Sequence, residues 1–161
     1  MVKMDIVMSG RAGDAGTALL LNRWRHRLEK RLPAFFLEQA GRLPKAEGAA
    51  PAGSFSVRIG SEGVFGALWR LGEGFGTGLR VELPRIPLFQ ETVEICEILE
   101  ISPYRLLSSG SIWLAENGHW SGGTVIGHTV GGTARVVESS WGIQYLTPPG
   151  AEASAGCNGT L

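Results

Sequence analysis

The chain has 161 residues and balanced charge, with 15 Lys and Arg against 15 Asp and Glu. This length is typical of one domain, and a formal net charge of zero provides no positive field for a nucleic-acid backbone. No run of about 18 apolar residues predicts a membrane span, and the first residues lack the pattern of a signal peptide. We therefore expect a cytoplasmic protein that binds neither nucleic acid nor a membrane. Glycine, at 24 residues, is about twice as frequent as the usual ~7% and indicates many turns.

Hydrophobic periodicity predicts strands and helices along most of the chain. Apolar residues at period two predict strands over residues 1–8, 55–59, 78–83, 111–116, 124–130, 133–138 and 142–146. Apolar residues at helical spacing predict helices from Thr17, over 61–74 and over 89–100. Thr17 is the candidate N-cap of the first helix, and Pro33 either kinks this helix or begins a second one that ends at Gly41. In the helix over 89–100 the residues expected to face inward are Phe89, Val93, Cys96 and Leu99, and those expected to face outward are Glu91, Glu94, Glu97 and Glu100.

These elements predict an α+β fold of layered α/β/α type, in which helices pack on a mixed sheet of about four to six strands. Residues 1–53 hold a strand, the glycine loop, helical sequence and a linker over 42–53. Residues 54–147 form the main domain, and 148–161 form a flexible tail. Asn-Gly at 117–118 and Gly-Gly at 131–132 are residue pairs that tight hairpins prefer, so we expect hairpins there.

Two glycine turns are candidate binding sites. Gly10, Gly13 and Gly16 precede a helix N-terminus, where free N–H groups and the helix dipole favour an anion. The loop lacks the Gly-Lys-Ser/Thr ending of a P-loop, so a structural turn is the alternative. Ser109 and Gly110 open a strand, and the hydroxyl there either binds a phosphate or satisfies the turn's own backbone.

The turn before the helix over 61–74 is the third candidate. Arg58, Ser61, Glu62 and Gly63 lie where a strand meets a helix N-terminus. The helix dipole stabilises a carboxylate at this end by ~0.3–1 kcal/mol, which explains Glu62 without a ligand. The alternative is a ligand site in which Arg58 pairs with a phosphate or carboxylate group.

The cysteines and histidines predict neither a disulfide framework nor a metal site. Cys96 and Cys157 are far apart in sequence and are interpreted as free thiols. His26, His119 and His128 have neither a helical i,i+4 partner nor a neighbouring CxxC pair. We therefore expect no metal centre, and no nucleophile can be paired with a base.

Several segments in order resemble the C-terminal half of AIR synthase-related proteins, and the run from 63 to 111 is specific. The segments are residues 5–8, 63–69, 86–96, 103–104, 107–111, 124–127 and 146–149. This superfamily contains aminoimidazole ribonucleotide synthase, the hydrogenase maturation dehydratase, selenophosphate synthetase and thiamine monophosphate kinase. The resemblance implies a layered α/β/α domain of proteins that use Mg-ATP for phosphoryl transfer. In the family an N-terminal domain, which also dimerises, builds most of the nucleotide site, and these residues do not resemble that domain.

The chain departs from the family pattern at two places. Before the helix the family has His-Asp, two residues and then Glu-Gly-Gly, but this chain has Arg58 in place of the Asp, and Glu62 matches the glutamate only with a one-residue gap. The family also carries a further helix between the positions of Glu116 and Thr124, where this chain has only a short connection. Both departures favour loss of activity.

We therefore expect a non-catalytic domain that binds a protein partner or a small phosphorylated ligand, with no cofactor for this chain alone. The partner is a second copy or a separate N-terminal half of AIR synthase type. The alternative is the substrate-side half of an ATP-dependent phosphoryl-transfer enzyme, of purine-biosynthesis or hydrogenase-maturation type, completed by that separate half. A third hypothesis is an eroded gene product without a ligand. In the first case we expect magnesium-independent binding of phosphate or sulfate near Arg58 and Ser61.

Overall fold

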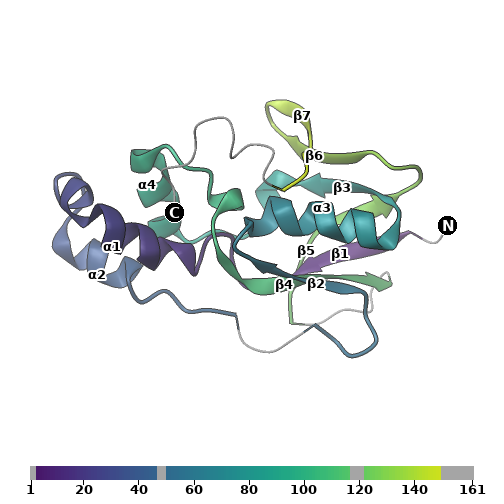
Figure 1. Cartoon of the computed structure of the whole chain (residues 1–161), viewed down its shortest axis with the longest axis horizontal. Helices are drawn as coiled ribbons and strands as arrows, with labels where there is room; N and C mark the ends of the chain where they lie inside the picture. Colours follow the sequence, from purple (N-terminus) through teal and green to yellow (C-terminus); the bar gives the residue numbers. More distant parts are fainter. Residues whose placement is uncertain (1–2, 47–49, 117–121, 150–161) are drawn as a thin grey trace.

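The computed structural model describes residues 3–46, 50–116 and 122–149, which form one mixed sheet with helices on one face and at one end (Figure 1). The strands are β1 (Met4–Met8), β2 (Ser56–Gly60), β3 (Gly78–Glu82), β4 (Ser108–Glu116), β5 (Thr124–Val130), β6 (Arg135–Ser139) and β7 (Gly142–Tyr145). The helices are α1 (Gly16–Glu29), α2 (Ala34–Ala40), α3 (Gly63–Phe75) and α4 (Gln90–Leu99), with short 3-10 helices at Leu83–Arg85 and Pro103–Arg105. The α+β class that we predicted is confirmed.

The sheet has seven strands in the order β2-β4-β1-β5-β3-β6-β7, more than the four to six expected. β3 and β6 pair in parallel, and the other neighbouring strands pair antiparallel. β1 lies between β4 and β5, at the middle of the order. The segments over 1–53 and 54–147 therefore contribute strands to the same sheet.

The hairpins that we expected at 117–118 and 131–132 are wrong, because the strands on either side of them are not neighbours. β1 lies between β4 and β5, and β3 lies between β5 and β6. The Asn-Gly pair itself falls outside the described residues. A tight hairpin forms instead between β6 and β7, where Ser139 pairs with Gly142. Local turn chemistry was overruled here by the pairing of strands that are distant in sequence.

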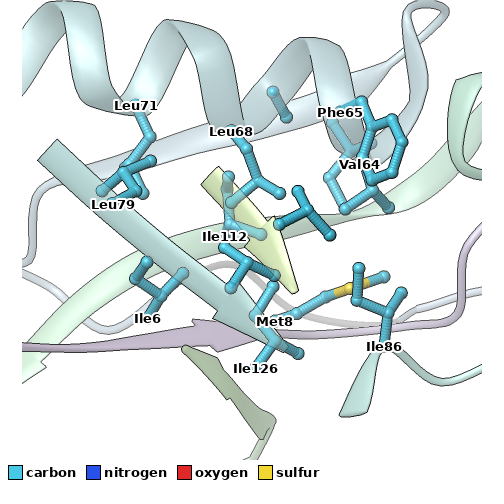
Figure 2. Close-up of a cluster of buried hydrophobic side chains, with 14 of the residues drawn as sticks. Ile6, Met8, Val64, Phe65, Leu68, Leu71, Leu79, Ile86, Ile112 and Ile126 are labelled. Atoms are coloured by element: carbon cyan, nitrogen blue, oxygen red, sulfur yellow. The ribbon is translucent and has the colours of Figure 1, made fainter. Parts of the chain in front are cut away.

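The main core lies between α3 and one face of the sheet (Figure 2). The apolar face of α3 packs on alternate residues of the strands, and the fully buried members of this cluster include Ile6, Val64, Leu68, Leu71, Leu79, Ile112 and Ile126. Each large apolar side chain buried in this way contributes about 1.5–3 kcal/mol. Gly63 has a φ of 71°, and a Cβ on it would lie 2.5 Å from the carbonyl oxygen of Tyr104. The backbone at Tyr104 therefore approaches α3 closely at Gly63, where a side chain would not fit.

A second core joins α1, α2 and α4 at the end of the sheet, so α4 does not lie on the sheet as we expected. Its buried residues include Leu20, Leu28, Leu37, Ile95 and Cys96. On α4 the buried side chains are Thr92, Ile95 and Cys96, whereas Val93 and Leu99 are only partly buried. The apolar stripe of α4 is rotated because it packs on helices and not on a sheet. In the described residues α3 alone covers a sheet face, so the expected α/β/α layering is reduced to one helical layer.

The start of α1 also differs from the expected capping. Ala15 occupies the N-cap and makes no side-chain cap. Thr17 lies inside the helix, where its hydroxyl donates to the carbonyl oxygen of Gly13 at 2.7 Å and lies 2.7 Å from the hydroxyl of Thr92. Thr17 therefore ties α1 to α4. Of the two interpretations of Pro33, the second is confirmed, since Pro33 is the N-cap of α2.

Candidate functional site

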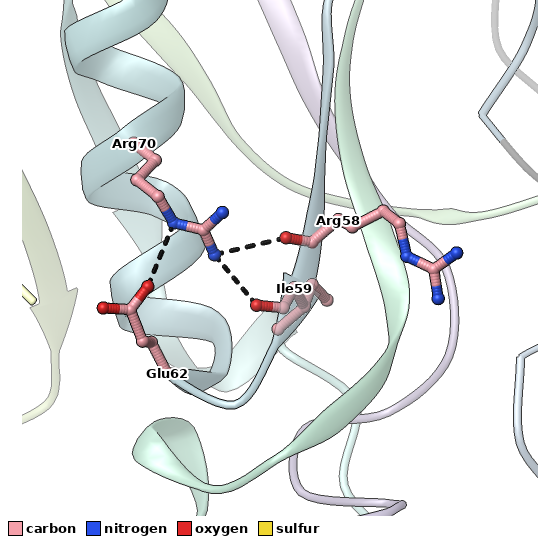
Figure 3. Close-up of polar contacts among 4 residues, drawn as sticks. All are labelled: Arg58, Ile59, Glu62 and Arg70. Carbon is pink, nitrogen blue, oxygen red and sulfur yellow. Dashed lines mark hydrogen bonds and ion pairs between the residues drawn. The ribbon is translucent and has the colours of Figure 1, made fainter.

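The turn between β2 and α3 places Glu62 against an arginine of the helix. The carboxylate Oε1 of Glu62 lies 3.3 Å from Nε of Arg70 and makes no side-chain cap at the helix N-terminus. Nη2 of Arg70 donates to the carbonyl oxygens of Arg58, at 3.2 Å, and Ile59, at 2.9 Å (Figure 3). The Glu62 carboxylate thus positions Arg70, and Arg70 covers the backbone of the β2 edge.

Arg58 and Glu62 do not form one site. The side chain of Arg58 is exposed and points away from Glu62 and Arg70 in Figure 3. It lies on the strand across from Ser111, and its guanidinium makes no ion pair or hydrogen bond within the described ranges. Ser61 is exposed at the turn itself. The structure therefore separates the guanidinium from the helix N-terminus that we had grouped with it.

The backbone N–H groups of the glycine-rich loop are largely used within the protein. The N–H of Gly13 donates to Oγ of Ser108 at 2.7 Å, and the N–H of Gly16 donates to the carbonyl oxygen of Leu107 at 2.9 Å. The N–H of Ala12 donates to Pro87, also at 2.9 Å. Gly10 and Gly13 have positive φ angles of 73° and 74°, which glycine adopts without strain. This geometry favours the structural-turn interpretation of the loop.

Asp14, which our sequence analysis did not select, organises this loop. Its side chain is buried, with 2% exposed, and its two oxygens accept from the N–H of Ser109 at 2.8 Å and the hydroxyl of Ser109 at 2.7 Å. Oδ2 also accepts from the N–H of Arg11 at 3.4 Å. The signal that could have found it is an acid placed between glycines directly before a helix. A carboxylate in this position opposes the binding of a phosphate.

Ser109 and Gly110, the other selected turn, lie directly against the glycine-rich loop. The hydroxyl of Ser109 accepts from the N–H of Ala46 while it donates to Asp14. A Cβ on Gly110 would collide with the carbonyl oxygen of Ser9, so this position requires glycine. The structure thus brings two of the three predicted sites together, as a satisfied polar junction between β1, β4 and the connector before β2.

A metal or Mg-ATP site of the kind implied by the resemblance does not fit the described residues. Those residues contain no group of three or more His, Cys, Asp or Glu side chains placed to hold a metal ion. Mg²⁺ is held through carboxylates close to the phosphates, and here Glu62 is paired with Arg70 and Asp14 is bonded to Ser109. Burial raises the pKa of the Cys96 thiol to about 12, which removes it as a nucleophile near neutral pH.

A groove of about 590 Å³ lies between α2, the segment after it and the start of α4. It is lined by Phe35, Glu38, Gln39, Arg42, Leu43, Pro44, Phe89 and Glu91. The guanidinium of Arg11 already stacks on the ring of Phe89, 4.2 Å from its centroid. Glu38 and Arg42 pair with each other at 3.1 Å on the surface. The Glu38–Arg42 ion pair therefore neutralises two of the three charged side chains that line the groove.

The solved structures with this fold include HypE hydrogenase maturation proteins and thiamine monophosphate kinases. E. coli HypE, a hydrogenase maturation protein, matches with a TM-score of 0.67 and 17% identity over 94% of this chain and 52% of its own. Thiamine monophosphate kinase from Aquifex aeolicus matches with a TM-score of 0.62 and 20% identity over 86% of this chain and 51% of its own. The chain has the fold of the AIR synthase-related C-terminal domain. No family model and no curated protein sequence matches it.

The chain spans about half the length of these neighbours. A further HypE structure holds ATP, and another is a complex of HypE with HypF. At 14–15% identity these two matches again show the fold alone. The resemblance stated from the sequence is confirmed at this level. In the described residues no helix is long and apolar enough to cross a membrane.

The most exposed large apolar side chains lie on the β6–β7 hairpin. Trp141 is 96% exposed at its tip, and Ile143 and Tyr145 on β7 are 56% and 68% exposed. Ile143 and Tyr145 lie on the sheet face opposite α3, because they pair with Glu138 and Val136. In Figure 1 no helix of the described residues covers this face. We call Trp141, Ile143 and Tyr145 the hairpin patch.

Proposed function

We propose that the chain is a non-catalytic binding domain of the AIR synthase-related C-terminal fold, and that its ligand is a protein. The observation that carries this proposal is the hairpin patch, in which three large apolar side chains project from one hairpin. Ile143 and Tyr145 lie on the same face of β7 beside the turn that holds Trp141, and exposed apolar patches mark interaction sites. Trp and Tyr are also the residues most often found at the energetic centre of protein interfaces.

The polar sites give less support to a small phosphorylated ligand. The N–H groups of the glycine-rich loop have acceptors inside the protein, and Asp14 places a carboxylate beside them. The guanidinium of Arg58 makes no hydrogen bond or ion pair within the described residues, and it points away from Glu62 and Arg70 at the start of α3. A phosphate there would be held by one exposed guanidinium, so we expect weak binding that does not depend on Mg²⁺.

Site-specific photo-crosslinking tests the protein-binding function. A benzophenone amino acid is placed at Trp141 in cells that produce the chain, and the same group is placed at Phe35 as a control. Phe35 is an aromatic residue on α2 that is 66% exposed, and α2 lies well apart from β7 in Figure 1. We expect a crosslinked protein product from position 141 and none from position 35. Absence of any protein product from position 141 contradicts the function.

The alternative, a substrate-side half of an ATP-dependent phosphoryl-transfer enzyme, is tested separately. It draws on the neighbours whose structures hold ATP or AMPPCP. Calorimetry with Mg-ATP and with inorganic phosphate distinguishes the two functions, because phosphoryl transfer depends on a metal ion that neutralises charge on the phosphates. We expect no tight binding of Mg-ATP and no hydrolysis. Magnesium-dependent binding that survives Arg58→Ala contradicts the non-catalytic assignment.

A further inference from the structure

We propose that β7 pairs with β7 of a second copy of this chain, so that the two sheets join about a twofold axis. This inference rests on the proposed function and names the protein partner of the hairpin patch. Three observations support it: the unused backbone groups of β7, an antiparallel register in which β7 pairs with itself, and the protected edge at β2. The side chains of the patch then determine the strength of the contact.

The outer side of β7 presents backbone groups that its own sheet does not use. The N–H of Leu146 donates to the carbonyl oxygen of Arg135 at 2.9 Å, which identifies this facing pair as a hydrogen-bonded one. Bonded and non-bonded pairs alternate along an antiparallel ladder, so Gln144 bonds to Val137 whereas Ile143 and Tyr145 face β6 without bonds. The N–H and C=O groups of Ile143 and Tyr145 therefore point outward from the edge of the sheet.

The strand is complementary to itself in the antiparallel direction. With Gln144 on the twofold axis, Ile143 of one copy lies opposite Tyr145 of the other, and the axis generates the same pair again. Both residues have outward backbone groups, so each pair exchanges both of its N–H···O bonds. A shift by one position places Gln144 against an outward residue, and a shift by two leaves one of the two outward residues opposite a position outside β7. No other antiparallel arrangement of β7 with itself therefore joins both outward residues to outward residues of β7. The alternation of hydrogen bonds between β6 and β7 therefore fixes the register of the β7–β7 pair.

The side chains beside this axis add apolar contacts and bring no like charges together. In the joined sheet Tyr145 of one copy lies between its own Val136 and Ile143 of the other copy, on the face opposite α3. Directly opposed aromatic and β-branched side chains contribute roughly 0.2–1 kcal/mol per pair. β7 carries no charged residue, and the chain has a net charge of zero. After β7 the described chain turns inward, since Leu146 is buried and Thr147 accepts from Arg105.

The other edge of the sheet limits the assembly to two copies. On β2 the carbonyl oxygens of Arg58 and Ile59 accept from Arg70, and the register of the strand is broken between Arg58 and Gly60. A capped and irregular edge does not accept a further strand. A twofold contact through one edge therefore closes, and no fibre grows from it.

Sedimentation velocity over a range of concentrations tests the dimer. We expect the unmodified chain to reach twice its monomer mass, and Tyr145→Lys to weaken association by about tenfold or more, since the twofold axis places two lysines at the contact. Phe35→Lys is the matched control, because Phe35 and Tyr145 are 66% and 68% exposed, and it should associate like the unmodified chain. A chain that stays monomeric at high concentration overturns the inference, as does a dimer that Tyr145→Lys leaves intact.

Disulfide trapping tests the register, in a chain in which Cys157 is replaced by serine. Gln144→Cys faces itself across the axis in a non-hydrogen-bonded pair, where the Cα atoms lie about 4.5 Å apart, within the range of a disulfide. Ile143→Cys faces Tyr145 and not itself, so it is the control. Cys96 is 2% exposed and does not interfere. We expect a covalent dimer from Gln144→Cys and none from Ile143→Cys, and the reverse result overturns this register.

These outcomes separate the inference from the function on which it rests. If the product crosslinked from position 141 is a different protein and the chain is monomeric, the dimer is wrong and the binding function stands. If position 141 crosslinks to no protein at all, both are wrong.

Discussion

The two edges of the sheet differ in how their backbone is protected. At β2 an arginine from α3 binds two carbonyl oxygens, and the strand carries a charged residue and an irregular register. At β7 all four residues are exposed, none is charged, and the ladder to β6 is regular. Exposed edges invite pairing with other chains, and proteins normally guard them with charge or irregular geometry. The contrast indicates that the β2 edge is protected and that the β7 edge is not.

Glu62, a candidate ligand-binding residue in the sequence, has a structural role at the β2 edge. Glu62 holds Arg70, and Arg70 covers the carbonyl oxygens at positions 58 and 59. A Glu at a helix N-terminus and an Arg about two turns further on thus protect the edge strand β2. Both edges depend on the core between α3 and the sheet, so substitutions in that core should have the largest effects on stability.

The largest expected effect comes from Leu68→Ala in the core between α3 and the sheet. Leu68 is fully buried, and a large-to-small change of this kind costs about 2–5 kcal/mol. Leu19→Ala on α1 is the matched control, because Leu19 is 45% exposed and loses little burial. Denaturant unfolding followed by circular dichroism measures both. A loss below about 1 kcal/mol for Leu68→Ala would show that α3 is not the support of the sheet.

A smaller effect on stability, with a change in association, is expected from Arg70→Met. The side chain of Arg70 is 40% exposed, so we discount its charge-assisted bonds and expect a loss of about 1 kcal/mol. The change also uncovers the carbonyl oxygens of β2. Introduced together with Tyr145→Lys, it should produce new self-association in sedimentation, because only the β2 edge has then changed.

The control for this change is Arg42→Met, which removes an arginine that is 77% exposed and paired with Glu38. It should alter neither stability nor association. If Arg70→Met with Tyr145→Lys remains monomeric, Arg70 is not what closes the β2 edge.

The sequence was sufficient to locate the elements but not to arrange them. Each predicted helix and strand overlaps an observed one, because apolar residues at period two or at helical spacing depend only on near neighbours. The placement of β1 between β4 and β5 depends on contacts between distant residues. The hairpin over 131–132 failed for this reason, since β3 entered between its two strands. The rotated inner face of α4 has the same cause.

The candidate site was predicted only in its parts. Gly10, Gly13, Ser109 and Gly110 were selected separately, and the structure joins them through Asp14. Sequence spacing cannot show that a loop near residue 14 and a strand near residue 109 meet, because more than 90 residues separate the partners of these bonds. The sequence analysis therefore treated the N–H groups of the selected glycines as free to bind an anion. In the folded chain the N–H groups of Gly13 and Gly16 have acceptors within the protein.

The smallest expected effect is a dependence of stability on His128, in the row that leads across the sheet to β7. This row, on the face opposite α3, is Asp5, His128, Arg80, Val136 and Tyr145. Burial, followed by the positive charge of Lys3, lowers the pKa of His128, with Arg80 acting in the same direction and Glu82 and Asp5 opposing it. Because the folded chain then binds fewer protons at this histidine than the unfolded chain, stability falls as the pH drops below the unfolded value of about 6.5.

Replacement of His128 by glutamine should therefore flatten the dependence of the unfolding free energy on pH between about pH 7 and 5. Above pH 7 the two proteins should show equal pH dependence, since His128 is neutral in both the folded and the unfolded chain there. Urea unfolding of both proteins across this range measures the difference and removes the contribution of the remaining titrating groups. An unchanged slope in His128→Gln would show that the charges around this histidine cancel its burial. A steeper slope would show that Asp5 and Glu82 outweigh burial, Lys3 and Arg80 together.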